Sequence, residues 1–183
     1  MRSLILSVAI VATLLAADPA RADDIVDKPW SVGFHLGFST ATPTNDATKG
    51  DYGTATTASF NMVIPAEYSF KIGPGVLVPG LAFALSAGKG GDNNVFIAIP
   101  MRLRYKFRPL SAPFYVYPLF EIGPTFHVKS GTALGLLRVG AGLSYLVHPM
   151  VELVFEPLGL GGVFNSDFSF FTYTMLLGLN VHF

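Results

Sequence analysis

Apolar and polar residues alternate along most of the chain from residue 30 onward. In the stretch from Trp30 to Ser39, large apolar side chains occupy every second position and small or polar residues lie between them. A period of two is typical of a β-strand whose two faces meet different surroundings. Seven further stretches follow the same period, although both faces of the second of them are apolar. They lie at about residues 58–70, 76–87, 95–107, 114–127, 133–147, from 151 onward, and 168–183.

The connections between these eight predicted strands alternate in character. Short or turn-like connections follow the second, fourth and sixth strands, at 71–75, 108–113 and 148–150. The connections after the first, third, fifth and seventh strands contain the polar, glycine-rich segments 41–57, 88–94, 128–132 and 162–167. This alternation is typical of a barrel that crosses a membrane, and closure leaves no unpaired strand edge in lipid. We therefore predict an all-β fold, a single closed antiparallel transmembrane β-barrel of eight strands.

Prolines interrupt several of the predicted strands. Because proline cannot donate a hydrogen bond to a strand ladder, each one predicts either a bulge or an earlier strand end. The tripeptide Ile-Gly-Pro at 72–74 and again at 122–124 suggests a turn in both places, and the second turn would break the fifth strand. The six prolines are Pro65, Pro79, Pro100, Pro118, Pro124 and Pro157.

The first 22 residues have the features of a secretory signal peptide. Arg2 provides a positive start, residues 4–17 are largely apolar, and Ala20-Arg21-Ala22 offers small residues where a signal peptidase cleaves. The apolar stretch is shorter than the roughly 20 residues of a membrane-spanning helix, which disfavours an uncleaved anchor. We expect residues 1–22 to be a cleaved signal peptide and residues 23–183 to form the barrel domain outside the cytoplasm.

Composition narrows the class of protein. Hydrophobic residues make up 51% of the chain and charged residues only 13%, compared with about 25% charged residues in an ordinary soluble domain. This argues against a disordered chain and against a typical soluble enzyme. Lys and Arg together number 12, as do Asp and Glu, so electrostatic binding of nucleic acid is not expected. The chain has no cysteine, which excludes disulfides and thiolate metal sites.

Charged residues inside the predicted strands all lie on the face opposite the apolar stripe. On the lipid face of a barrel, Arg or Lys at mid-membrane would cost about 2–4 kcal/mol. We therefore predict that these four acids and four bases point into the lumen and pair there as a structural network. They are Glu67, Arg102, Arg104, Lys106, Glu121, Arg138, Glu152 and Glu156.

The end of the chain carries the most specific pattern. The last predicted strand alternates apolar residues and ends in Phe, although Val181 stands where an aromatic residue is often found. In this respect the chain resembles the small eight-stranded outer-membrane β-barrels of diderm bacteria. The resemblance implies an outer-membrane location with both termini in the periplasm, contact with outer-membrane lipid, and an assembly signal read by the barrel assembly machinery. The signal would comprise Tyr173, Met175, Leu177, Leu179, Val181 and Phe183.

The four histidines are the candidates for catalytic or metal-binding groups. Outer-membrane barrel enzymes that deacylate lipid A place His and Ser two residues apart, whereas here His127 and Ser130 are three apart and no Ser follows near His148. His35 and His182 fall on predicted lumen faces, where a hydrogen-bonded interior role is expected. We predict no catalytic residues, no metal site and no cofactor.

These observations predict an integral, porin-like barrel of the cell envelope with a packed polar lumen. Its expected role is structural or surface-interacting, through an extracellular partner that the pattern leaves open. The alternatives are a narrow outer-membrane pore, a lipid-modifying membrane hydrolase, and a lipocalin-like barrel with an apolar ligand inside. Eight strands leave an interior just wide enough for side chains to fill, which disfavours a wide pore.

Overall fold

The computed structural model describes residues 22–46, 48–49, 55–88, 95–109 and 114–183. Strand is by far the main secondary structure of these residues, preceded by the short helix α2 (Ala22–Asp27). The strands are β1 (Trp30–Pro43), β2 (Thr57–Tyr68), β3 (Phe70–Ile72), β4 (Gly75–Gly88), β5 (Val95–Ala98), β6 (Met101–Phe107), β7 (Phe114–His127), β8 (Ala133–His148), β9 (Val151–Phe164) and β10 (Ser169–His182).

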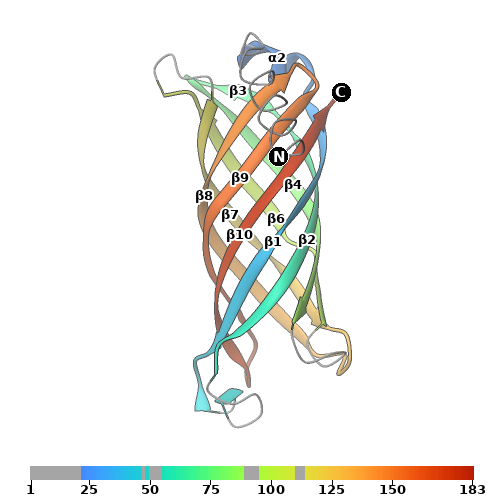
Figure 1. Ribbon diagram of the computed structural model, residues 1–183, viewed down its shortest axis with the longest axis vertical. Helices are drawn as coiled ribbons and strands as arrows, with labels where there is room; N and C mark the ends of the chain where they lie inside the picture. The colour runs from blue at the N-terminus through green and yellow to red at the C-terminus, as the bar shows by residue number, and fades with distance from the viewer. Residues whose placement is uncertain (1–21, 47, 50–54, 89–94, 110–113) are drawn as a thin grey trace, which may run out of the picture.

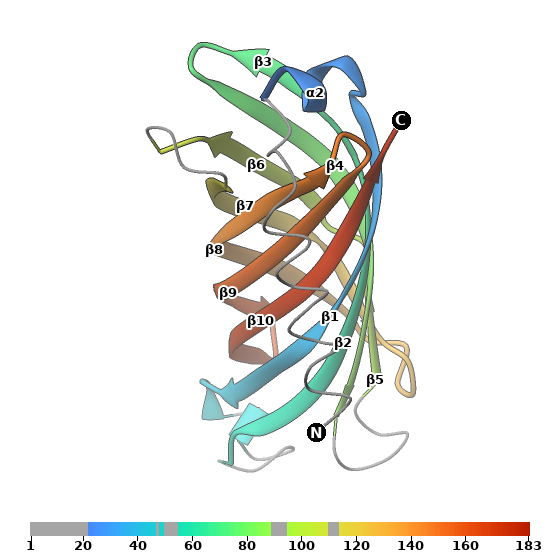
Figure 2. The ribbon, with the colours of Figure 1, turned by 45° about the horizontal axis from the view of Figure 1, so that its top comes forward.

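The ten strand segments form one closed antiparallel barrel with eight strand positions around its wall (Figure 1). We call each position a stave, whether one segment or two consecutive segments occupy it. Two staves are made of two segments each: β2 with β3, and β5 with β6, both of which pair with β4. The first and last strands, β1 and β10, pair along 13 residues from Ser31–His182 to Pro43–Phe170, which closes the barrel. The eight strands predicted from the alternating pattern are confirmed, and Figure 2 shows them tilted around a common axis.

Side chains alternate between the outside and the lumen along every stave. In β1, Trp30, Val32 and Phe34 are exposed, while Ser31 and His35 between them are buried. Large apolar residues on the outer face are strongly exposed, such as Leu177 at 62% and Met101 at 60%. A soluble protein would bury such residues, so this outer surface suits lipid.

The stave β4, whose two faces are both apolar in sequence, has a clear orientation. Leu81 and Phe83 point outward, whereas Val76, Val78 and Ala82 are buried in the lumen. Small and β-branched residues thus face the crowded interior, and the bulkier Leu and Phe face outward.

The two ends of the barrel differ. At the α2 end lie helix α2, the turn between β3 and β4, the turn between β8 and β9, and Phe183, whose backbone N–H donates to the Trp30 carbonyl at 2.9 Å (Figure 1, top). At the opposite end, which we call the loop end, lie residues 44–46, 48–49 and 55–56 and the connection between β9 and β10 at 165–168.

The prolines act in two ways. Pro100 separates β5 from β6, and its carbonyl accepts a hydrogen bond from the Ala82 N–H at 2.9 Å. Pro157 lies where the pairing of β9 with both its neighbours shifts register, as expected for a bulge. The other four prolines, Pro65, Pro79, Pro118 and Pro124, lie within continuous strands.

Only one of the two Ile-Gly-Pro turns is present. Residues 72–74 do form the turn from β3 to β4, where Gly73 adopts a φ of 58° that favours glycine. The turn suggested at 122–124 is wrong, because β7 runs unbroken from Phe114 to His127. There the Pro124 carbonyl still accepts a hydrogen bond from the Ile99 N–H at 3.0 Å, so the ladder continues past the ring.

Helix α2 was not expected from the sequence pattern, and it covers one mouth of the barrel (Figure 2). Its Ile25 is fully buried against four lumen residues, Val76, Val78, Tyr115 and Leu146. The Ile25 side chain therefore packs into this mouth of the lumen. In the described part of the chain, no helix is long and apolar enough to cross a membrane.

Candidate functional site

The lumen holds the charged residues that the sequence pattern directs inward. All eight are buried, from complete burial for Arg104, Lys106 and Glu152 to 6% exposure for Arg138. Three of the bases come from β6, and the acids come from β2, β7 and β9. Because the register of each strand is known, the pairs can be placed in order along the barrel axis.

The layer nearest the α2 end is centred on Glu152. Lys106 Nζ lies 2.5 Å from Glu152 Oε1, and the other carboxylate oxygen accepts hydrogen bonds from Asn180 Nδ2 at 3.0 Å and His182 Nε2 at 3.3 Å. Asn180 Oδ1 in turn lies 2.9 Å from His35 Nε2. The predicted interior, hydrogen-bonded roles of His35 and His182 are confirmed.

The middle layer joins Arg104 to Glu67. Their guanidinium and carboxylate groups form a direct ion pair, and both side chains are fully buried. The Arg104 guanidinium also lies over the Tyr117 ring, 5.0 Å from its centroid, in a cation–π contact. The Tyr117 hydroxyl donates to Glu156 Oε1 at 3.3 Å and so links this layer to the next.

The third layer is a closed ring of two arginines and two glutamates, which we call the luminal ring: Arg102, Glu121, Arg138 and Glu156. Arg102 Nε lies 2.8 Å from Glu121, and Arg102 Nη2 lies 2.6 Å from Glu156. Arg138 completes the ring with contacts of 2.6 Å to Glu121 and 3.4 Å to Glu156. Each carboxylate therefore meets two guanidinium groups, and the charges of the ring cancel.

Glycines make room for this network. A Cβ atom on Gly142 would collide with the Tyr117 ring, and a Cβ atom on Gly178 would collide with His35. The large polar side chains lie directly against the backbone of the neighbouring stave at these positions.

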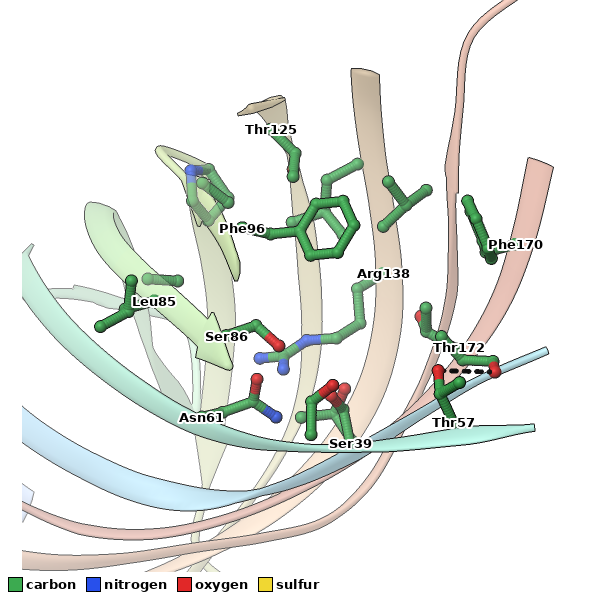
Figure 3. A pocket seen from close by; sticks show the side chains of 18 of the residues that line it. Ser39, Thr57, Asn61, Leu85, Ser86, Phe96, Thr125, Arg138, Phe170 and Thr172 are labelled. Atoms are coloured by element: carbon green, nitrogen blue, oxygen red, sulfur yellow. Dashed lines mark hydrogen bonds between the residues drawn. The ribbon is translucent and has the colours of Figure 1, made fainter. Parts of the chain in front are cut away.

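Beyond the luminal ring, toward the loop end, the lumen opens into a cavity of about 190 Å³ (Figure 3). Glu121 and Arg138 of the ring line it at one side, and Asn61, Ser86 and Phe96 extend into the same space. We call it the loop-end cavity. The alternating pattern did not predict this cavity, although the sequence carries a signal for it, because many inward residues of this half of the barrel are small. They include Ser39, Ala41, Ser59, Ala84, Ser86 and Ala98.

His127 and Ser130 meet at the loop end despite their spacing of three. His127 Nδ1 lies 2.7 Å from Ser130 Oγ, which also lies 2.7 Å from the Thr132 hydroxyl. In the same turn, the Gly131 N–H donates to the His127 carbonyl at 2.9 Å. The contact thus closes the connection between β7 and β8. In the residues described by the structure, no group of three or more His, Asp or Glu side chains is placed to hold a metal ion.

The six residues of the proposed assembly signal all point outward from β10 and the residue after it. Their exposed fractions run from 36% for Tyr173 to 62% for Leu177, with Phe183 at 60%. They share the outer surface with the other apolar residues of the barrel. Their role in assembly stays a prediction.

Deleting Phe183 is expected to lower the amount of folded barrel in the membrane several-fold, because the last strand loses its terminal aromatic residue. Phe34→Ala is the matched control, since Phe34 is also an outward aromatic residue (49% exposed) but lies in β1. Heat-modifiable mobility on gels of membrane fractions measures folded barrel. Equal levels of the two variants would contradict the assembly role.

Comparison with known proteins gives a fold and no sequence family. No family model matches the chain, and no curated protein matches its sequence. Among solved structures, Neisserial surface protein A (NspA) superposes with a TM-score of 0.58 at 16% identity, over 84% of this chain and 97% of that one. The outer membrane enzyme PagL superposes with a TM-score of 0.54 at 12% identity, over 81% of this chain and 97% of that one.

These similarities show that the chain has the fold of the small outer-membrane β-barrels, as the resemblance in sequence implied. At such low identity they carry the fold alone. Because one of the two neighbours is an enzyme, the fold by itself decides neither for nor against catalysis.

Proposed function

We propose that this protein is a sealed, non-enzymatic barrel of the bacterial outer membrane, with a structural or surface-interacting role exerted at its loop end. The observation that carries this proposal is the filled lumen, in which three layers of paired charges block the path from the α2 end to the loop-end cavity. A pore needs a continuous hydrated path. The charged side chains here are instead paired with one another and buried.

Opening such a path would mean separating buried ion pairs. Breaking a buried pair by removing one partner typically costs about 3–5 kcal/mol, because the surviving charge is left without compensation. Helix α2 adds a further obstacle, since Ile25 packs into the same mouth. These features disfavour the narrow pore as the alternative function.

The loop end offers a surface built from the first and last hairpins. The Thr44 N–H donates to the Ser169 carbonyl at 2.9 Å, and the Ser169 N–H donates to the Thr48 hydroxyl at 2.8 Å. Asn45 Nδ2 also donates to the Asp167 carbonyl at 2.9 Å. Hydrogen bonds thus join two segments that are far apart in sequence, one at residues 44, 45 and 48 and the other at residues 167 and 169. This supports a defined surface at the loop end that a partner could contact.

A cysteine at Asp46 is expected to react from outside intact cells with a reagent that does not cross membranes, because Asp46 is exposed at the loop end. A cysteine at Met150 is the matched control. Met150 is 39% exposed in the turn between β8 and β9 at the α2 end, so it is expected to react only after the outer membrane is disrupted.

The reverse pattern, with labelling at Met150 and protection at Asp46 in intact cells, would contradict the proposed orientation with periplasmic termini. Protection of both cysteines until the outer membrane is disrupted would contradict exposure of the loop end at the cell surface.

A further inference from the structure

We infer that the loop-end cavity is a binding site for a small, uncharged amphiphile that carries an oxygen acceptor on an apolar body. The cavity lies beyond the luminal ring and plays no part in sealing the barrel. The size of the cavity, the balance of its charges and two polar side chains without a partner each restrict the kind of ligand that would bind. The inference does not depend on which way the barrel is oriented.

The volume of the cavity fits a ligand about the size of a benzene ring with a short substituent. An engineered apolar cavity of about 150 Å³ in another protein binds benzene. At about 190 Å³, the loop-end cavity has room for such a ring with a short substituent.

The charge balance favours an uncharged ligand. Among the described residues that line the cavity, Glu121 and Arg138 are the charged ones, and they lie 2.6 Å from each other. Arg138 has a second carboxylate contact, 3.4 Å from Glu156. A charged ligand would thus enter a buried space whose charges are already compensated, and this is costly.

Two polar groups in the lining have no hydrogen-bond partner within the described chain. Asn61 is 7% exposed and its Nδ2 is unpartnered, and Thr125 is 3% exposed with an unpartnered Oγ1. A buried donor left unsatisfied costs about 1–3 kcal/mol, so each favours a ligand that accepts its hydrogen bond. Asn61 comes from β2 and Thr125 from β7, on staves separated by β4 and β5, so donors are available on two parts of the wall.

The rest of the lining suits an apolar body. Phe96, Leu136, Val163 and Phe170 contribute large apolar side chains to the wall, and Figure 3 shows Phe96 and Phe170 coming from different strands. Small sites in proteins typically combine such apolar walls with a few placed polar groups.

Ordered water is the competing occupant, since it could also satisfy Asn61 and Thr125. Three probes of similar shape separate the two cases. Acetophenone has an apolar ring and one oxygen acceptor, α-methylstyrene lacks the acceptor, and benzoate carries a charge. Titrations of the full barrel in lipid nanodiscs would be followed by NMR, at the side-chain amide of Asn61 and at the backbone amide of Ala98, which also lines the cavity.

Acetophenone is expected to shift both signals saturably. α-Methylstyrene is expected to bind at least about tenfold more weakly, because it has no acceptor for the donors of the wall, and benzoate is expected to cause no shift. Thr125→Val keeps the side-chain shape and is expected to weaken acetophenone binding at least about fivefold. Asn61→Leu is expected to do the same when read at Ala98. Ser144→Ala is the control, because Ser144 is a buried, unpartnered hydroxyl that does not line the cavity, and it is expected to leave binding unchanged.

Three results would overturn the inference. Absence of a saturable acetophenone shift would mean that the cavity holds water only. Shifts of equal size in the wild type and in both cavity variants would mean that the probe dissolves in the lipid around the barrel. Tighter binding of benzoate than of acetophenone would contradict an uncharged ligand.

Discussion

Replacing Arg104 with methionine is expected to lower the free energy of unfolding of the barrel by about 3–5 kcal/mol. Arg104 and Glu67 form a direct ion pair, and both side chains are fully buried in the lumen. Methionine keeps the apolar length of the side chain but removes the charge. The Glu67 carboxylate then loses its direct partner and keeps the longer, 3.9 Å contact to Arg102 Nε, which compensates the buried charge less well. The loss is therefore mainly the cost of the stranded carboxylate.

The effect would be measured as the denaturant dependence of unfolding in detergent or lipid, followed by the fluorescence of Trp30, the single tryptophan of the chain. Adding Glu67→Gln to Arg104→Met is expected to recover part of the loss, because it removes the stranded charge. Lys49→Met is the matched control. The Lys49–Asp46 pair is 3.6 Å apart and exposed, and such pairs contribute about 0–1 kcal/mol.

A loss for Arg104→Met no larger than that for Lys49→Met would contradict the buried pair. So would a double variant that is less stable than Arg104→Met alone, because removing the partner charge would then bring no relief.

The strands could be predicted from sequence because apolar and polar residues alternate as clearly in a membrane barrel as in a soluble sheet. The barrel only reverses the direction, with apolar residues toward the lipid outside and polar residues toward the lumen. In β6, Met101, Leu103 and Phe107 face outward while Arg102 and Arg104 face inward, and this period is visible in the sequence. Each stave obeys the same rule, since lipid excludes charge from one face and the lumen accommodates it on the other.

The pairing inside the lumen could not be predicted in the same way. Arg104 meets Glu67, which lies one stave beyond the neighbour of β6, and Lys106 meets Glu152 from β9. Which side chains share a layer depends on the tilt and stagger of the strands, and a local pattern does not carry that information. The sequence narrowed the partners of the arginines to four glutamates and left the choice among them open.

Two other features depend on tertiary packing. Helix α2 is too short to show a convincing helical period, and its place is determined by the burial of Ile25 in the barrel mouth. The loop-end cavity exists because the inward residues of several staves are small at the same height, which becomes visible only when the staves are aligned. The mistaken turn at 122–124 has a similar cause, since pairing with both neighbours keeps Pro124 within a strand.

In planar lipid bilayers, the intact protein is expected to carry no stable single-channel current. Three layers of paired side chains cross the lumen, at Lys106–Glu152, at Arg104–Glu67 and at the luminal ring. A hydrated ion would have to displace groups that are buried and held by contacts as short as 2.5–2.8 Å. The loop-end cavity does not change this expectation, because it lies on one side of the ring.

The most direct test of the sealed barrel is therefore a conductance measurement on protein whose folding and insertion are verified by heat-modifiable gel mobility. A general porin inserted into the same bilayers provides the positive control. Current at the level of protein-free bilayers, with folded barrel present and the porin conducting, is the result predicted here. Large, stable single-channel steps from the folded protein would contradict the packed lumen and favour the pore.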